Sequence, residues 1–281
     1  MKNKIIVDSC VDFKVGIFEG DFLFERIPFK LRIDDDELID QDLSTTMLVD
    51  RMKMSKHKVS TACPSPQEYL NAIDPNCVNY IITISDKLSG SYNSATNAAV
   101  MAKEQYPDCK VYVFDSKSAA AGEDLIFMRL KAFIHENLPT SEIVDRITNG
   151  IDTMRTMFIL NSLDNLAKNG RVSSTVALIG KVLKVIPIMS ENGDGEIALK
   201  EKVRGRKHAF ARLVELIAEE VTDAGEKILA ITHVHALETA EKLKAMAEET
   251  CGFKDIVIFD AGGLSTVYAD NGGVIVAFNR K

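Results

Sequence analysis

The sequence lacks several features that would assign it to a common class of protein. Its five cysteines are scattered, odd in number and contain no C-x-x-C pair, which favours reduced thiols over a disulfide framework or a zinc site. No apolar run reaches the roughly 18 residues that a membrane-spanning helix needs. The first ten residues enter a strand-like segment directly, without a signal peptide. We therefore expect a cytoplasmic protein without a transmembrane segment.

Basic charge is also in short supply. Asp and Glu exceed Lys and Arg, and the formal net charge is −7. Because nucleic-acid binding needs a basic face, we expect no nucleic acid among the partners of this chain. The 281 residues include 46% apolar and 27% charged residues, a globular balance that suits one large domain or two ordinary ones.

The first half of the chain alternates between strand-like and helix-like segments. Such alternation predicts right-handed βαβ units and a parallel sheet. The pattern changes after Asn137, where two strand-like segments, 182–189 and 196–203, flank the turn sequence ENGDG and predict an antiparallel pair. We predict an α/β fold with two domains, a Rossmann-like parallel domain at 1–153 and a mixed α/β domain at 154–281.

The stretch Tyr80–Gln105 combines a strand, a turn and a helix. Ile81–Ile84 is apolar and β-branched, as in a buried strand, and the Ala-rich segment from Ser91 onward favours a helix. The turn between them, SDKLSGS, carries hydroxyls at a helix N-terminus, where anions are favoured. It predicts a site for the negative head of a ligand. The alternative is that its serines only cap the helix.

Four predicted strands end in turns that carry hydroxyl groups, at Ser9, Thr61, Ser89 and Ser116. Open parallel sheets bind ligands beyond the carboxyl ends of their strands. If the strand before Thr61 runs parallel to the others, its hydroxyl faces the same crevice as Ser89. We therefore predict that Asp8, Ser9 and Ser116 line a crevice at this edge.

Six segments resemble motifs of the DegV family, in the family's order. They are Asp8-Ser9 with Asp12 (D-S-x-x-D), Thr61–Pro66 (T-S-x-P-S-P), Leu88–Ala95 (L-S-G-T-Y-x-S-A), Asp115-Ser116 (D-S), Leu166–Ser173 (L-x-K-G-G-R-I-S) and Lys202–Lys207 (K-V-R-T-R-K). Each motif is weak alone, but six in the right order are specific, and the resemblance covers nearly the whole chain.

The resemblance implies a non-enzymatic protein that binds one long-chain fatty acid, such as palmitate or stearate, and no cofactor. In such proteins the acyl chain lies in an apolar tunnel and the carboxylate is held between the two domains. Carried over to this chain, the carboxylate ligands are Thr61, Ser89 and Gly90. These ligands agree with the interpretation of the strand ends above, in which hydroxyls and helix N–H groups bind an anion. A buried acyl chain gains about 0.8 kcal/mol per CH₂.

Some members of the family present the fatty acid to a separate kinase. The resemblance implicates Arg171, Arg204 and Arg206 in contacts with that partner or with phosphate. The sequence departs from the family at the motif H-x-G-P-G, where Tyr268 replaces the histidine and Asp270 stands nearby. The Tyr268 hydroxyl can still donate a hydrogen bond to a carboxylate, so we include it among the head-group ligands.

The alternative function is catalytic, as a serine hydrolase or phosphotransferase that uses Ser89. His208, His233 or His235 would then be the base, yet Ser89 lacks a G-x-S-x-G elbow and the chain lacks a P-loop. We also expect no metal. The acidic patch 34–37 lacks the spacing of a calcium loop. His233 and His235 could share a face of a strand, but no nearby residues complete a zinc site.

Overall fold

A parallel four-stranded sheet forms the first half of the molecule, which is described here by a computed structural model covering residues 1–281 except 13, 15, 180–183 and 281. Its strand order is β2-β1-β6-β7, and all three pairings are parallel. The strands are β1 (Lys2–Asp8), β2 (Leu23–Ile27), β6 (Cys77–Thr83) and β7 (Lys110–Asp115). β6 is buried along its whole length, as expected for an inner strand covered on both faces.

A six-stranded mixed sheet forms the second half. Its order is β10-β9-β8-β13-β11-β12, and only β11 and β12 pair in parallel. The strands are β8 (Met154–Ile159), β9 (Val185–Glu191), β10 (Ile197–Arg204), β11 (Ile228–His233), β12 (Asp255–Asp260) and β13 (Val274–Asn279). The predicted antiparallel pair is confirmed, although residues 182 and 183 of its first strand lie outside the described residues. The α/β fold with one parallel and one mixed sheet is therefore also confirmed.

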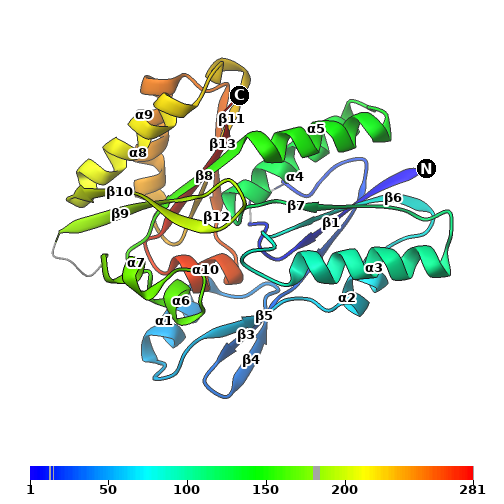
Figure 1. Ribbon diagram of the computed structural model, residues 1–281, viewed down its shortest axis with the longest axis horizontal. Helices are drawn as coiled ribbons and strands as arrows, with labels where there is room; N and C mark the ends of the chain where they lie inside the picture. The colour runs from blue at the N-terminus through cyan, green and yellow to red at the C-terminus, as the bar shows by residue number, and fades with distance from the viewer. Residues whose placement is uncertain (13, 15, 180–183, 281) are drawn as a thin grey trace.

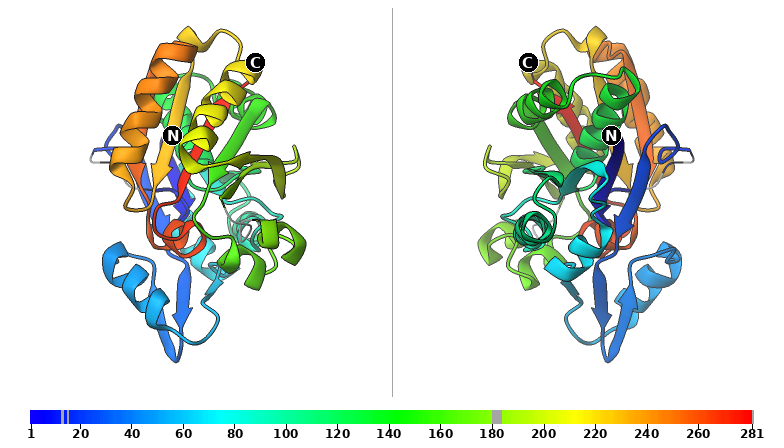
Figure 2. Two further views of the ribbon diagram at one scale, coloured as in Figure 1. Left: turned by 90° about the vertical axis from the view of Figure 1, so that its left-hand side faces the viewer. Right: turned by 90° about the vertical axis from the view of Figure 1, so that its right-hand side faces the viewer.

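A small antiparallel sheet, β4-β3-β5, projects from the molecule together with α1 (Thr45–Met54), as Figure 2 shows. Its strands are β3 (Lys30–Ile33), β4 (Asp36–Ile39) and β5 (Ser60–Ala62). Pro28 separates β2 from β3, because it lacks the N–H that a continuous strand needs. The condition under which the Thr61 hydroxyl would face the crevice of Ser89, a strand parallel to the others, is not met. β5 pairs antiparallel with β3.

Helices cover both sheets and fill the space between them (Figure 1). The helices α2 and α3 lie on the parallel sheet, α8 and α9 lie on the mixed sheet, and α4 contacts strands of both. Their bounds are α2 (Pro66–Ala72), α3 (Ser91–Gln105), α4 (Ala121–His135), α5 (Thr140–Thr153), α6 (Asp164–Lys168), α7 (Ser174–Ile179), α8 (Arg206–Glu220), α9 (Leu237–Cys251) and α10 (Gly263–Ala269).

One apolar core joins the two sheets through α4. It contains Phe127 and Leu130 of α4, Tyr80 of the parallel sheet, and Phe259 and Ala277 of the mixed sheet. Because both sheets pack on one helix, their relative position is set by apolar burial. The division into domains at 153/154 falls at the junction of α5 and β8 and stays a prediction.

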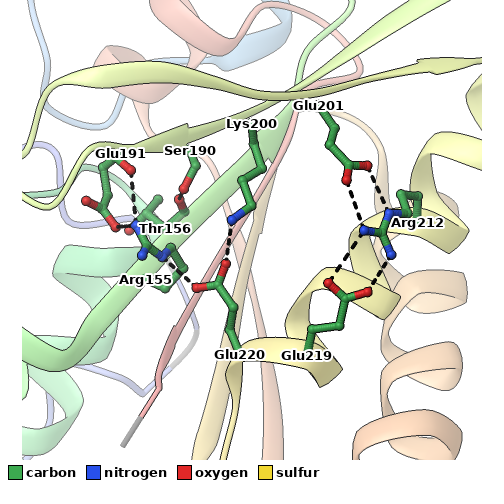
Figure 3. A network of polar contacts seen from close by, with 9 residues as sticks. All are labelled: Arg155, Thr156, Ser190, Glu191, Lys200, Glu201, Arg212, Glu219 and Glu220. Atoms are coloured by element: carbon green, nitrogen blue, oxygen red, sulfur yellow. Dashed lines mark hydrogen bonds and ion pairs between the residues drawn. The ribbon is translucent and has the colours of Figure 1, made fainter.

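Charged side chains tie the outer strands of the mixed sheet to α8 (Figure 3). Arg155 of β8 binds Glu220 of α8 at 2.8 Å and also Glu191 at the end of β9. Arg212 of α8 donates two hydrogen bonds of 2.9 Å to Glu201 of β10. These contacts anchor the β9–β10 hairpin on β8 and α8, and at the hairpin tip the Ser85 hydroxyl of the parallel half donates to the Gly195 carbonyl at 2.9 Å.

Candidate functional site

Asp8 joins the turn after β1 to the turn after β6. Its carboxylate accepts hydrogen bonds from the backbone N–H groups of Cys10 and Ile84, both at 3.0 Å, and from the Ser91 hydroxyl at 2.6 Å. The side chain is fully buried, and this burial raises the pKa of Asp8, while the three hydrogen bonds oppose the rise. Asp8 therefore sets the position of the Ser85–Ser91 turn.

Ser9 and Ser116 are also fully buried and bonded within the protein. The Ser9 hydroxyl donates to Asp40 at 2.7 Å and accepts the N–H of Phe29 at 2.9 Å. The Ser116 hydroxyl donates to the carbonyl of Ser118 at 3.0 Å and accepts its N–H at 3.1 Å. Both serines thus stabilise turns.

An apolar cavity lies at the carboxyl edge of the parallel sheet, against the mixed sheet and α10. Its empty volume is about 750 Å³, counting space open to solvent. Its wall consists of Cys10, Ile84, Leu88, Lys117, Ser118, Ala119, Ala120, Thr156, Phe158, Leu160, Leu166, Arg171, Glu191, Gly195, Ile197, Leu264, Ser265, Tyr268, Ala269 and Ile275. Both halves of the chain contribute to it.

The predicted crevice residues lie behind this wall. Among the described residues, the wall includes Cys10 and Ser118 instead of Asp8, Ser9 and Ser116. The prediction that the last three line the crevice is thus not supported by their contacts. Cys10 lies one residue beyond Ser9, and Ser118 lies two residues beyond Ser116. Both line the cavity because the turn has changed the direction of the side chains.

Thr61 meets Tyr268 although β5 is not part of the parallel sheet. The Thr61 Oγ1 atom lies 2.8 Å from the Tyr268 hydroxyl oxygen. Tyr268 is presented by α10, a helix of seven residues that contacts α1 and α6 and that the sequence patterns did not predict. Of the two residues, Tyr268 lines the cavity.

Arg171 completes the junction. Its Nε atom donates to the Leu88 carbonyl at 2.9 Å, and its guanidinium lies 5.8 Å from the centre of the Tyr268 ring. The neighbouring residue Asn169 donates to the Val59 carbonyl at 2.9 Å. Segments far apart in the sequence therefore place one cation and the Thr61–Tyr268 hydroxyl pair at the same end of the cavity.

A polar crevice adjoins the cavity at this end. Leu88 and Arg171 border both spaces, while Ser89 and Gly90 line the crevice alone. The Ser89 hydroxyl accepts the N–H of Ser91 at 3.3 Å. The helix α3 begins at Ser91 with Gly90 as N-cap and no side-chain cap at that position, so the Ser89 hydroxyl is the serine group that meets the start of the helix.

Gly90 also brings the turns of Thr61 and Ser89 together. A Cβ atom at Gly90 would lie 3.3 Å from the sulfur of Cys63, which shows how closely the two turns approach. Thr61, Ser89, Gly90, Tyr268 and Arg171 thus gather around the junction of apolar cavity and polar crevice. Such a junction suits a ligand with an anionic head and an apolar body.

Arg204 and Arg206 lie outside the wall of the cavity as far as the described residues define it. Arg206 donates to the Gly272 carbonyl at 2.7 Å and to the Asn161 side chain, and stacks 5.2 Å from the centre of the Phe210 ring. It thereby supports the loop that follows Tyr268. Arg204 is exposed at the end of β10.

The histidines proposed as catalytic bases have other partners. His235 lies 2.9 Å from the Thr45 hydroxyl, and His233 is buried with its Nε2 atom 3.4 Å from Asp260. Burial lowers the pKa of His233. His208 is exposed at the start of α8. Within the described part of the chain, no histidine forms a hydrogen bond with Ser89, so the geometry does not favour a hydrolase.

A buried acidic cluster lies beneath the cavity. Donor atoms of Asp8, Cys10 and Glu123 fall within 4.8 Å of one another, the one such set of possible metal ligands found in the described ranges. Asp8 already accepts three hydrogen bonds, which leaves it little capacity for an ion. Neither carboxylate oxygen of Glu123 accepts a hydrogen bond from a residue that the structure describes, and burial raises the pKa of Glu123 well above the usual value. Sequence reasoning missed Glu123 entirely.

Comparison with known proteins identifies the family. The protein-family model described as "Uncharacterised protein, DegV family" matches residues 2–281. The chain belongs to the DegV family. A DegV domain-containing protein of Streptococcus gordonii is 31% identical over 279 residues, which cover 98% of each chain.

Solved structures of DegV proteins superpose closely on this chain. A DegV family protein of Ruminococcus gnavus, refined with vaccenic acid, has 35% identity and a TM-score of 0.92, with 99% of each chain covered. A DegV family protein of Eubacterium eligens, loaded with heptadecanoic acid, has 31% identity, a TM-score of 0.92 and the same coverage. The fatty acid kinase (Fak) B3 protein of Streptococcus pneumoniae, loaded with linoleic acid, has 29% identity, a TM-score of 0.93 and full coverage of both chains.

Across the part of the chain that the structure describes, no helix of this DegV protein combines the length and the apolar character needed to span a membrane.

Proposed function

We propose that this protein binds one long-chain fatty acid. The acyl chain occupies the apolar cavity, and the carboxylate lies where the cavity meets the polar crevice. The observation that carries the proposal is the position of Tyr268 and Arg171 at one end of a cavity whose wall is otherwise largely apolar. The fatty acids present in the solved DegV relatives support the same ligand class.

The energetics of such a complex divide between the two parts of the ligand. Each buried CH₂ group contributes about 0.8 kcal/mol, so the acyl chain supplies most of the affinity. The carboxylate supplies direction, because burying it without a partner would be costly. Arg171 uses Nε and Nη1 for the carbonyls of Leu88 and Asn169, which orients the guanidinium, while its Nη2 group makes no hydrogen bond with the residues that the structure describes.

Presentation of the bound acid to a separate kinase is a finer part of the proposal. It rests on the named Streptococcus pneumoniae relative and on exposed Arg204. Arg206, which binds the Gly272 carbonyl, supports the loop next to Tyr268 and would keep the head group in reach. The protein itself would act as a carrier without catalysis.

The first experiment is extraction of the gently purified protein, with native mass spectrometry of the complex. We expect one fatty acid per chain, and delipidated protein should rebind palmitate or stearate. A protein that is free of lipid and takes up neither acid would contradict the proposal. Turnover of p-nitrophenyl esters that is abolished by Ser89→Ala would favour a hydrolase instead.

A cavity-filling variant tests the location of the acyl chain. Ala119 lines the cavity, so Ala119→Leu should shorten or narrow the space and weaken binding of stearate more than that of a shorter acid. Ala245 is exposed on α9, and Ala245→Leu is the matched control. Equal affinities of the two variants for all acids would argue that the chain lies elsewhere.

A further inference from the structure

A second hollow lies at the opposite edge of the mixed sheet from the fatty-acid cavity. It is bordered by Ile228 at the start of β11, whereas the cavity is bordered by Ile275, which pairs with Thr232 near the other end of β11. The ends of α4 and α5 and the short 3₁₀ segment Ala224–Glu226 form its walls. The proposed fatty-acid site therefore does not use this hollow.

The hollow concentrates positive charge in an acidic protein. Its wall contains Arg129, Arg146, Lys227 and Lys254 but one acidic residue, Glu226, among the described residues, while the whole chain carries a net charge of −7. Clustered like charges repel one another unless an anion lies between them. A wall of this composition attracts anions and raises their local concentration.

Two of the four cations already have partners. Arg146 donates to Glu142 at 2.6 Å and lies over the Phe133 ring. The Lys227 ammonium binds the carbonyl and hydroxyl of Thr222. Lys254 is exposed, and its ammonium makes no hydrogen bond or ion pair with the residues that the structure describes. It is free to move toward a ligand.

Arg129 is the residue that most needs a partner. It is half-buried on α4, yet its guanidinium makes no hydrogen bond or ion pair in the described part of the chain. Burial alone lowers its pKa, with no acidic neighbour to oppose the effect. A guanidinium that is withdrawn from water without compensation is costly, and an anion in the hollow would remove that cost.

Gly150 of α5 fixes where this guanidinium lies. A Cβ atom at Gly150 would be 2.8 Å from Arg129 Nη1, so the absence of a side chain lets the guanidinium rest against the helix backbone. Its planar fork is thereby held at the wall, next to the exposed Asn149. A pre-positioned guanidinium suits bidentate binding of phosphate or carboxylate oxygens.

We propose that this hollow binds a phosphate group, with Arg129 as its bidentate ligand and Lys254 as the second cation. Two unpaired cations favour a dianion over a single carboxylate. The apolar side chains of Met128 and Phe133 in the same wall suit a phosphate monoester whose organic part covers them. The phosphate could be free, part of a small metabolite or the headgroup of a lipid, and these sources share the same chemistry at Arg129.

The test is calorimetric titration of the full-length protein with inorganic phosphate and with glycerol 3-phosphate, at an ionic strength matched with chloride. Removing a charge-assisted hydrogen bond typically weakens binding by roughly tenfold or more, and we expect this of Arg129→Gln. Arg129→Lys should recover part of the loss, because it keeps the charge but not the fork. Lys254→Gln should weaken binding severalfold.

Lys103 is the control. It is exposed on α3 and lies outside the wall of the hollow, so Lys103→Gln should leave the affinity unchanged. If Arg129→Gln does not fold, exposed Lys254 still carries the test. Capture solely by vesicles that contain phosphatidic acid, weakened by the same variants, would assign the phosphate to a lipid headgroup. Absence of saturable binding of all three probes, or equal binding by every variant, would overturn the proposal.

Discussion

Replacing Tyr268 with phenylalanine removes one hydroxyl from the end of the cavity, and its consequence can be worked out from the Thr61–Tyr268 pair. Two hydroxyls that are bonded to each other at 2.8 Å have one O–H left to donate outward. Tyr268 lines the cavity, so the pair should act as a relay in which Thr61 donates to Tyr268 and Tyr268 donates to the carboxylate.

The relay predicts unequal effects of the two single variants. A hydrogen bond to a charged group contributes about 1.5–3 kcal/mol, so Tyr268→Phe should weaken fatty-acid binding by roughly 10- to 150-fold. Thr61→Val removes a neutral hydrogen bond that contributes about 0.5–1.5 kcal/mol and should cost roughly 2- to 12-fold. The double variant should bind as Tyr268→Phe does, because the outer bond is already lost.

The assay is displacement of a fluorescent fatty acid from delipidated protein, with Tyr106→Phe as the control, since Tyr106 is exposed beyond the end of α3. Equal single effects that multiply in the double variant would refute the relay and indicate that both hydroxyls bind the carboxylate directly. Unchanged affinity in all three site variants would refute the position of the head group.

Three further outcomes follow from the same structure. From laurate to stearate, each added CH₂ should tighten binding about fourfold until the cavity is full, since it contributes about 0.8 kcal/mol; a flat series in the displacement assay would contradict an apolar site. Gly195→Ala should lower the unfolding free energy by roughly 1–3 kcal/mol, because the φ angle of Gly195 is +89° and a Cβ atom there would lie 2.3 Å from Ser85 Oγ and 3.0 Å from Lys117 Cα. In the control Gly193→Ala, the added Cβ atom meets nothing within 4 Å, so the unfolding free energy should fall by about 1 kcal/mol. Burial raises the pKa of Glu123, so its contribution to stability is complete below the unfolded value of about 4.3 and is lost as pH rises toward the folded value. Glu123→Gln should therefore gain stability relative to the wild type as pH rises from about 4 to about 8, and parallel urea-unfolding profiles of the two proteins would exclude this reasoning.

Much of the architecture follows from local patterns. Apolar β-branched segments such as Ile81–Ile84 become buried strands because only a covered sheet satisfies both their side chains and their backbone. The ENGDG turn forms the β9–β10 hairpin because its glycines accept positive φ, +97° at Gly193 and +89° at Gly195. The six family motifs likewise need no coordinates to be recognised.

The candidate site depended on contacts that no local pattern specifies. Thr61 and Tyr268 are 207 residues apart, and their meeting requires a sheet, β4-β3-β5, and a helix, α10, that the sequence did not indicate. Ser9 and Ser116 look like ligands in the sequence, but their buried hydroxyls donate hydrogen bonds within the protein, to the Asp40 carboxylate and to the Ser118 carbonyl.

The sequence by itself determined the alternation of elements, the hairpin and the family, because these depend on residues within one or a few turns of each other. Only the tertiary structure decided which hydroxyls face the cavity and which are buried behind it. The physical reason is that the direction of a side chain after a strand end is set by the distant segments that pack against the turn.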